Sequence, residues 1–398
     1  MPENLFDKKI IQVMSISSPT VRRSFGYLPM LDGIRGLAIA LVLAHNTQML
    51  DSPTGTWGKI VEFVLDRGWV GVPLFFVLSG YLISGILLDT QRSANYFRSF
   101  FGRRVLRIFP LYFMTLFVML IVLPSLGLLG ARGIPPLHDQ LPLWLYYSNW
   151  TNWTGAFGWS ADELPHYWTL AVEEQFYLIW PFVLRRASAR QVLTICGWVA
   201  VAALLIRVVM LMSGADSAAV YEFSFCRMDS LALGAAVAAA VRIPKIGNML
   251  CLRQNALYLA IVVLAIAGVL VTRGFGRTSM ATQTVGYTIV SLIGALVVLA
   301  AVNAGSSHGA RALSLLRTAP LRILGKYSYG IYVFHKPLHD FVGKQLIEAL
   351  NLRLADSASL NLIYVSGCLL ASLGLAMLSY HLVEVRFLRL KRYFEASP

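Results

Sequence analysis

The sequence carries little charge for its length. Only 14% of its 398 residues are Asp, Glu, Lys or Arg, whereas 57% are hydrophobic. A soluble globular protein has about 25% charged residues, so the deficit argues against a water-soluble chain of two or three domains. Apolar runs of about 20 residues, the length that crosses a bilayer as a helix, recur along the chain instead.

Cysteine and acidic residues are also scarce. The four cysteines, Cys196, Cys226, Cys251 and Cys368, show no CxxC spacing and lie in or beside apolar runs. This pattern predicts small buried side chains and no metal site. The 20 acidic residues are outnumbered by 34 Lys and Arg, which leaves a formal net charge of +14. Because the basic residues concentrate in alternate loops, they indicate membrane orientation, and we expect no nucleic-acid partner.

The apolar runs predict an all-α integral membrane protein. Lipid admits only helices and closed barrels as spanning structures, and continuous apolar runs favour helices. The expected bundle has about ten transmembrane helices with both termini cytoplasmic. We expect the spans at 31–50, 68–89, 105–125, 167–184, 191–213, 222–241, 254–272, 281–303, 324–343 and 360–384. Residues 1–27 and 393–398 are the expected cytoplasmic tails.

The first span contains two polar side chains that lipid disfavours. Arg35 lies near its cytoplasmic end, and His45 follows ten residues later, about 15 Å along a helix. An ionisable residue within a span suggests function. A neutral histidine can take a proton from a hydroxyl group. The alternative is a histidine that is hydrogen-bonded between packed helices.

A basic cluster follows the second span, in the segment RSFFGRRVLRIFP. Its members Arg104 and Arg107 are spaced i, i+3, so both side chains project from one helical face. Such a pair suits bidentate phosphate binding, and the phosphates of coenzyme A are candidate ligands for Arg103, Arg104 and Arg107. The positive-inside rule explains part of the cluster without any ligand.

Two adjacent carboxylates interrupt the segment HYWTLAVEEQFYLIWP. Carboxylates in an apolar helix are costly unless they are paired or functional. His166, Glu173 and Tyr177 fall on one helical face, whereas Glu174 points about 100° away. The shared face predicts a site for substrate and catalysis, with Glu174 as a further candidate substrate contact.

Other candidate substrate contacts lie elsewhere in the chain. In FCRMDSLALGA, Arg227 and Asp229 are spaced i, i+2 and cannot face each other, so we expect them to pair across helices. The long external loop at 126–166 contains Trp150 and Trp153, which suit either sugar stacking or an interfacial aromatic belt. The tyrosines of GKYSYGIYVFHKP, which are Tyr327, Tyr329 and Tyr332, suit either a wall that faces the acceptor or such a belt, and we expect the belt.

Seven segments occur in an order that resembles a known family. They are LDGIRGLAIALVLAHN, WVGVPLFFVLSGYLISG, RRVLRIFPLY, HYWTLAVEEQFYLIWP, FCRMDSLALGA, LGKYSYGIYVFHKP and YHLVEVRFLRLK. Together, over residues 28–392, they are similar to the membrane-bound acyltransferase-3 family. That family includes bacterial cell-surface O-acetyltransferases and some macrolide acyltransferases.

The resemblance implies a bundle of about ten membrane helices. It also implies acyl transfer, usually of acetyl, from coenzyme A at the cytoplasmic side to a hydroxyl of a glycan or other acceptor. The family's first-span Arg and His correspond to Arg35 and His45, and its cytoplasmic RxxR corresponds to Arg104 and Arg107. Its WxLxxEEQFY helix gives the acidic role to Glu173, which is expected to orient the histidine or the acceptor.

The spacing of the first-span pair departs from the family by one residue. The family's histidine position is occupied here by Asn46, and His45 precedes it. One step turns a helix by about 100°, so either His45 acts from a rotated helix or Asn46 takes part of its role. Direct transfer is the expected route. Covalent intermediates on His45 or Ser79 are alternatives.

The sequence therefore predicts an O-acyltransferase of the bacterial inner membrane. Its expected donor is acyl-CoA, in particular acetyl-CoA, and its expected acceptor is a cell-envelope or exported glycan. The resemblance leaves three alternatives: a lipid-linked glycan transporter or flippase, an acyltransferase for a small molecule such as a macrolide, and a non-catalytic scaffold. The acyl chain length, the acceptor's identity and oligomer formation stay open, and membrane lipid is the expected surrounding partner.

Overall fold

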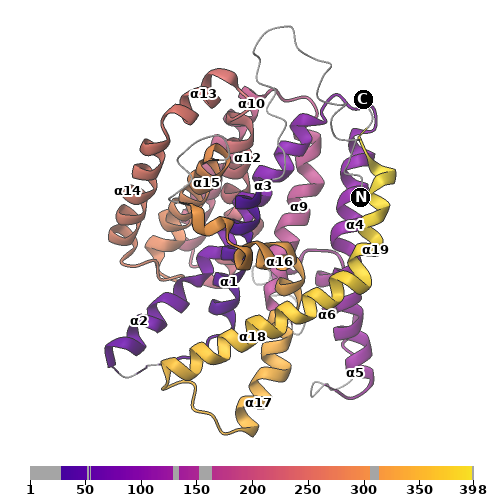
Figure 1. Cartoon of the computed structure of the whole chain (residues 1–398), viewed down its shortest axis with the longest axis vertical. Helices are drawn as coiled ribbons and strands as arrows, with labels where there is room; N and C mark the ends of the chain where they lie inside the picture. Colours follow the sequence, from indigo (N-terminus) through magenta and orange to yellow (C-terminus); the bar gives the residue numbers. More distant parts are fainter. Residues whose placement is uncertain are drawn as a thin grey trace, which may run out of the picture.

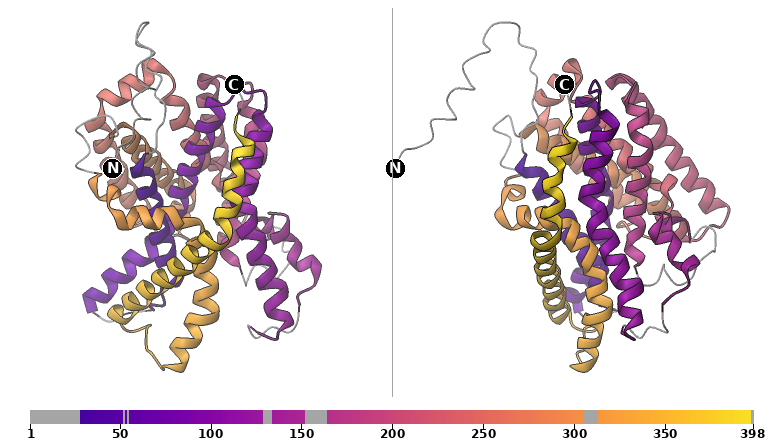
Figure 2. Two further views of the ribbon diagram at one scale, coloured as in Figure 1. Left: turned by 45° about the vertical axis from the view of Figure 1, so that its right-hand side comes forward. Right: turned by 90° about the vertical axis from the view of Figure 1, so that its right-hand side faces the viewer.

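A computed structural model describes residues 28–51, 53, 55–128, 134–151, 164–304 and 313–396, and all elements in these ranges are helical. The long helices form one bundle, in which α18 lies obliquely across the others (Figures 1 and 2). They are α1 (Pro29–Thr47), α2 (Gly55–Asp66), α3 (Gly71–Asp89), α4 (Tyr96–Phe117), α9 (Trp168–Leu184), α10 (Ala189–Met212), α12 (Ser224–Ala240), α14 (Gln254–Thr272), α15 (Tyr287–Ala304), α16 (Ala319–Pro337) and α18 (Ala358–Ser379).

Shorter elements extend or join these helices. They are η1 (Arg67–Val70), η2 (Val118–Val122), α5 (Leu123–Ser125), α6 (Leu137–Trp144), η3 (Ser148–Trp150), η4 (Pro165–Tyr167), α11 (Ser217–Glu222), α13 (Pro244–Leu252), η5 (Thr282–Gly286), η7 (Ser314–Arg317), η8 (Leu338–Gly343), α17 (Lys344–Ala349), η9 (Tyr380–Glu384), α19 (Val385–Arg389) and η10 (Leu390–Phe394). The four cysteines are all free.

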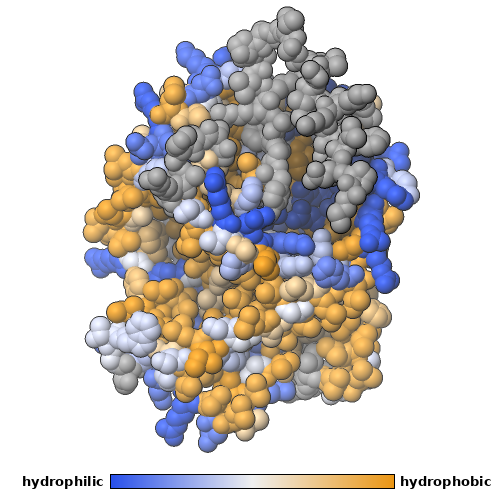
Figure 3. All heavy atoms as spheres, in the orientation of Figure 1, coloured by the Kyte–Doolittle hydropathy of each residue, from blue (hydrophilic) through white to orange (hydrophobic). Residues whose placement is uncertain are grey.

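Seven helical segments are long and apolar enough to cross a membrane within the described ranges. They are Gly55–Asp89, Tyr96–Ser125, Ala189–Met212, Ser217–Ala240, Gln254–Thr272, Thr282–Ala304 and Ala358–Phe394. Only 17% of the apolar window of α14 and 22% of that of α10 are buried inside the protein, so their outer faces suit lipid contact. Hydrophobic side chains also cover much of the face in Figure 3. The described part of the chain is thus all-helical and has the long apolar helices of a multi-pass membrane protein.

Three further expected spans coincide with α1, α9 and α16, which are not among the seven segments. Their polar residues lower their mean hydropathy, and the cavities described below account for those residues. The total of ten crossings and the side on which the termini lie stay predictions.

Close contact between α1 and α16 depends on small residues. A Cβ on Gly36 would overlap the carbonyl of Leu321, and a Cβ on Gly325 would overlap the carbonyl of Asp32. Glycine therefore lets the two backbones touch, as in other membrane helix pairs. This contact brings the polar residues of α1 next to those of α16.

The C-terminal helical segment, which runs from α18 to η10 (Ala358–Phe394), crosses the bundle obliquely from α2 toward the start of α4 (Figures 1 and 2). There Ser99 donates a hydrogen bond to the carbonyl of Phe394 at 2.7 Å, and Asn95 donates to the carbonyl of Glu395 at 2.8 Å. These contacts hold the last turns of the chain against the cytoplasmic end predicted for α4.

Candidate active site

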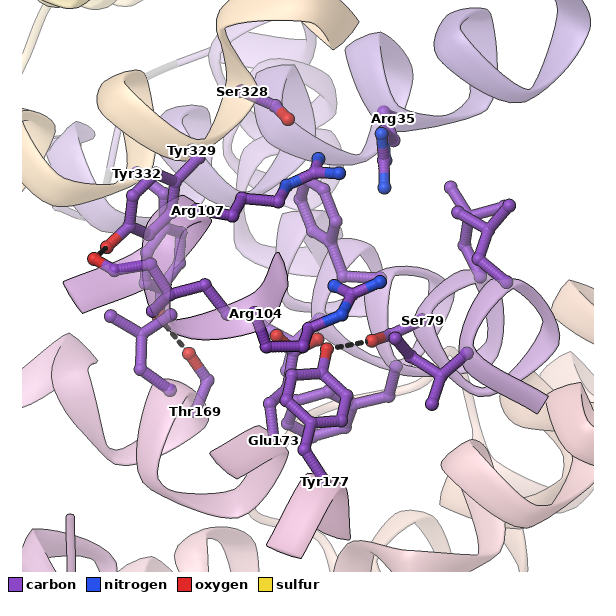
Figure 4. A pocket seen from close by; sticks show the side chains of 18 residues that line it. Arg35, Ser79, Arg104, Arg107, Thr169, Glu173, Tyr177, Ser328, Tyr329 and Tyr332 are labelled. Atoms are coloured by element: carbon purple, nitrogen blue, oxygen red, sulfur yellow. Dashed lines mark hydrogen bonds between the residues drawn. The ribbon is translucent and has the colours of Figure 1, made fainter. Parts of the chain in front are cut away.

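A cavity at the centre of the bundle, called here the central cavity, is lined by α1, α3, α4, α9 and α16. Its polar side chains are Arg35, Ser79, Arg104, Arg107, Thr169, Glu173, Tyr177, Ser328, Tyr329 and Tyr332 (Figure 4). Apolar side chains, mostly from α3, complete the wall. The cavity is narrow, with a volume of about 110 Å³.

The predicted arginines and the predicted acidic helix meet in this cavity. Arg35, Arg104 and Arg107 approach from α1 and α4 (Figure 4). The guanidinium of Arg104 lies 5.3 Å from the centre of the Tyr177 ring, and the Tyr177 hydroxyl is hydrogen-bonded to that of Ser79. The structure thus brings together side chains from α1, α3, α4 and α9. From the sequence alone, these four segments could only be considered separately.

A wider cavity, the basic mouth, adjoins the central cavity and shares Arg35, Arg107 and Tyr329 with it. Its volume is about 530 Å³. Its other charged residues are Asp32, Arg322, Lys326, Glu384 and Lys391. Five of the seven charged side chains around this mouth are cations, so it favours an anionic ligand.

A third cavity, the histidine pocket, adjoins the central cavity through Val72, Thr169 and Tyr332, which line both. Its volume is about 130 Å³. The rest of its lining is Val42, His45, Asn46, Trp69, Pro165, His166, Trp168, Tyr221, Glu222, Arg277 and Lys336. The three cavities therefore form a series from the basic mouth through the central cavity to His45.

His45 and Asn46 both face the histidine pocket because α1 ends at Thr47 and its last turn forms the wall. The side-chain amide of Asn46 donates to Nε2 of His335 at 3.0 Å. An amide NH₂ can only donate, so Nδ1 of His335 carries the proton and donates to the carbonyl of Tyr332 at 2.7 Å. Nδ1 of His45 is buried and has no hydrogen-bond partner among the described residues.

The wall between the central cavity and the histidine pocket is hydrogen-bonded. The Tyr332 hydroxyl donates to the carbonyl of His166 at 2.5 Å and accepts from Thr169 at 2.5 Å. Both nitrogens of the buried His166 ring lack a hydrogen-bond partner in the described part of the chain. We call the pair Thr169–Tyr332 the partition, because in this structure it separates Arg104 and Glu173 from His45.

The tyrosines of α16 do not form an interfacial belt, contrary to the expectation. Tyr327 and Tyr332 are only 7% and 8% exposed, and Tyr329 and Tyr332 line the cavities. A belt prediction from composition was wrong because α16 lies against α1 and α18. Sequence reasoning also missed Thr169. It directly follows Trp168, and no pattern in the sequence distinguishes it.

Arg227 and Asp229 are fully buried but line none of the three cavities. Asp229 pairs across helices, as expected, with Arg207 at 3.0 Å, and it also accepts from Thr288 at 2.9 Å. Arg227 instead stacks on aromatic rings, 4.5 Å from the centre of the Tyr287 ring. The ion pair and its hydrogen bond to Thr288 join α10, α12 and α15.

The remaining predicted contacts lie outside the cavities. Arg103 is exposed, and Glu174 is on the wall of none of them. Trp150 packs against Phe223, with 5.7 Å between ring centres. Trp153 lies outside the described residues. The roles predicted for these four side chains stay predictions.

Comparison with known proteins supplies a family. The model of a family described as an acyltransferase domain matches residues 28–381. The peptidoglycan O-acetyltransferase OatA of Listeria monocytogenes is 30% identical over 347 residues, which cover 80% of this chain and 50% of that protein. The O-acetyltransferase OatA of Staphylococcus aureus (strain NCTC 8325 / PS 47) is 29% identical over 347 residues, covering 81% and 52%.

A third relative, the putative peptidoglycan O-acetyltransferase YrhL of Bacillus subtilis, is 30% identical over 343 residues, covering 78% of this chain and 48% of that protein. The chain thus spans about half the length of these curated relatives. No solved structure matches.

Proposed function

The chain belongs to the acyltransferase domain family whose model it matches, and from this membership we propose that it is a membrane O-acetyltransferase. It transfers an acetyl group from acetyl-CoA to a hydroxyl of a cell-wall or other envelope glycan. The printed names of the relatives support a glycan acceptor. We place the protein in the cytoplasmic membrane of a bacterium, with the basic mouth facing the cytoplasm, in agreement with the loop charges.

The series of three cavities carries this proposal. The wide basic mouth suits the phosphates of coenzyme A, which Arg107, Lys326 and Lys391 would contact. The narrow central cavity admits an extended thioester arm and excludes a nucleotide. The series ends at His45, a group that can accept a proton.

The transfer takes place when the partition opens and joins the histidine pocket to the central cavity. His45 accepts the proton of the acceptor hydroxyl as its oxygen attacks the thioester carbonyl. Arg35 and Arg104, which line the central cavity, stabilise the negative charge that develops on the carbonyl oxygen. The C–S bond then breaks, the sulfur takes up the proton, and the products are the O-acetyl ester and free coenzyme A.

Glu173 acts on the donor side in this scheme. It lines the central cavity and not the histidine pocket, so it does not orient His45. Its carboxylate balances the arginines around the thioester. Asn46 positions His335 through the hydrogen bond between them, and His45 is therefore the proposed base.

Labelled acetyl-CoA and membranes that contain the full chain test the proposal. His45→Ala is expected to lower acetyl transfer by about 10²–10⁴-fold, the range of general-base catalysis, with unchanged amounts of inserted protein. Asn46→Ala is the matched control and should cost about tenfold or less, because it removes one neutral hydrogen bond. Full transfer by His45→Ala would reject His45 as the base.

A further inference from the structure

The loop between α14 and η5 holds an unusual backbone conformation. Arg273, Gly274 and Phe275 have φ values of 53°, 97° and 57°. The left-handed region is unfavourable for residues with a Cβ, and it persists where surrounding contacts impose it. Here two of the three consecutive residues in that region are not glycine.

Three side chains fix this loop through its backbone carbonyls. Arg67 donates from Nε to the carbonyl of Gly274 at 2.8 Å, and Trp69 donates from Nε1 to that of Phe275 at 3.1 Å. Tyr287 donates its hydroxyl hydrogen to the carbonyl of Arg277 at 3.0 Å. Residues from η1 and α15 thereby hold the loop at both ends.

The fixed loop places Arg277 in the wall of the histidine pocket. Its guanidinium lies 5.0 Å from the centre of the Tyr221 ring. The ion pairs found among the described residues do not include it. The other cation of this wall, Lys336, pairs with Asp340 at 3.1 Å, and Asp340 also pairs with Lys344 at 2.6 Å.

A second arginine contacts the same Tyr221 ring. Arg227 lies 5.1 Å from the ring centre and is 0% exposed. Within the part of the chain that the structure describes, none of its three guanidinium nitrogens has a hydrogen-bond partner. A buried cation without hydrogen bonds is costly, and the rings of Tyr221 and Tyr287 offset part of this cost for Arg227. Among the described residues, the wall carries the cations of Arg277 and Lys336 and the carboxylate of Glu222, and Arg227, which contacts Tyr221 from outside the lining, adds a further positive charge nearby.

Aromatic rings complete this end of the pocket. Trp69, Trp168 and Tyr221 all line it. Aromatic faces combined with polar groups suit a ring-shaped ligand that is apolar on its faces and polar at its edges. A saccharide has this character, and a cation at the wall selects for negative charge on it.

We propose that the histidine pocket takes a saccharide that carries an anionic substituent, a carboxylate or a phosphate, and that Arg277 binds the oxygen atoms of this substituent. The inference rests on the proposed function, in which His45 acts on an acceptor hydroxyl in the same pocket. Arg277 would thereby select which envelope sugars are acetylated.

Binding of three sugar probes to the purified full-length chain in detergent tests the inference. The probes are methyl glucoside, methyl glucuronide and glucose 6-phosphate. At least one anionic probe should bind about tenfold or more tightly than the glucoside, as one charge-assisted contact implies. The comparison between the two anionic probes identifies whether a carboxylate or a phosphate is preferred.

Arg277→Gln should abolish this preference, and Arg277→Lys should keep part of it. Both variants should retain the loop conformation, because Arg67, Trp69 and Tyr287 hold the loop through its backbone carbonyls. Arg273→Gln is the matched control: Arg273 lies in the same loop but is exposed and outside the pocket, so this variant should bind like wild type.

Equal binding of all three probes by the wild type, or an undiminished preference in Arg277→Gln, would overturn the inference. Failure of the proposed function would look different. In that case the wild type would release no free thiol from acetyl-CoA in the presence of any acceptor, whatever its preference among the sugars.

Discussion

Exchange of Tyr332 for phenylalanine tests whether the partition keeps water away from the thioester. Tyr332 makes hydrogen bonds of 2.5 Å to Thr169 and 2.5 Å to the carbonyl of His166. Phenylalanine retains the ring and loses both. Each such bond contributes about 1 kcal/mol net, so the closed arrangement loses about 2 kcal/mol and its open fraction rises about 30-fold.

Acetyl-CoA hydrolysis without an acceptor should rise by the same order in Tyr332→Phe, because water then enters from the histidine pocket. The release of free thiol by the purified protein measures it. Tyr329→Phe is the matched control, since Tyr329 lines the central cavity but donates to the carbonyl of Ile108 at 2.7 Å. If Tyr332→Phe hydrolysed acetyl-CoA at the wild-type rate, or if Tyr329→Phe raised the rate equally, the role of the partition would be refuted.

Two further pairs of variants compare a charge that lines a cavity or is buried with an exposed charge. Arg107→Gln should raise the KM for acetyl-CoA about tenfold through loss of a charge-assisted phosphate contact. Arg103 is exposed, so Arg103→Gln should leave this KM unchanged. Initial rates measure both KM values, and equal effects of the two variants would contradict phosphate binding in the basic mouth. Asp229→Ala leaves Arg207 buried without its 3.0 Å partner and should cost about 3–5 kcal/mol of unfolding free energy. Asp89→Ala removes the 53% exposed partner of Arg242 and should cost under about 1 kcal/mol of unfolding free energy. Unfolding in detergent compares the two variants, and similar losses of unfolding free energy would contradict the structural importance given to the Arg207–Asp229 pair.

The order of elements could be read from the sequence to a large extent. Each expected span coincides with a helix, because runs of apolar residues can satisfy their backbone in lipid only in that way. The spacing rules also placed Arg104 and Arg107 on one face, and the structure has both in the central cavity. Local periodicity was sufficient for these predictions.

The candidate site was less accessible to sequence reasoning. The proposal of His45 over Asn46 as the base rests on a hydrogen bond between Asn46 and His335, 289 residues away. The partition joins Thr169 to Tyr332, 163 residues apart. No local pattern encodes such contacts, since they depend on which helices become neighbours.

The sequence by itself determined that the chain is a helical membrane protein of the acyltransferase-3 type, because hydropathy and motif order are properties of the chain alone. Only the tertiary structure decided which polar residues share a cavity. The packing of α1 against α16 puts His45 in one pocket and Arg35 in another. The hydrogen bonds that hold the loop of Arg277 likewise need side chains from η1 and α15. Lipid constrains each helix separately, whereas a site forms only where several helices meet.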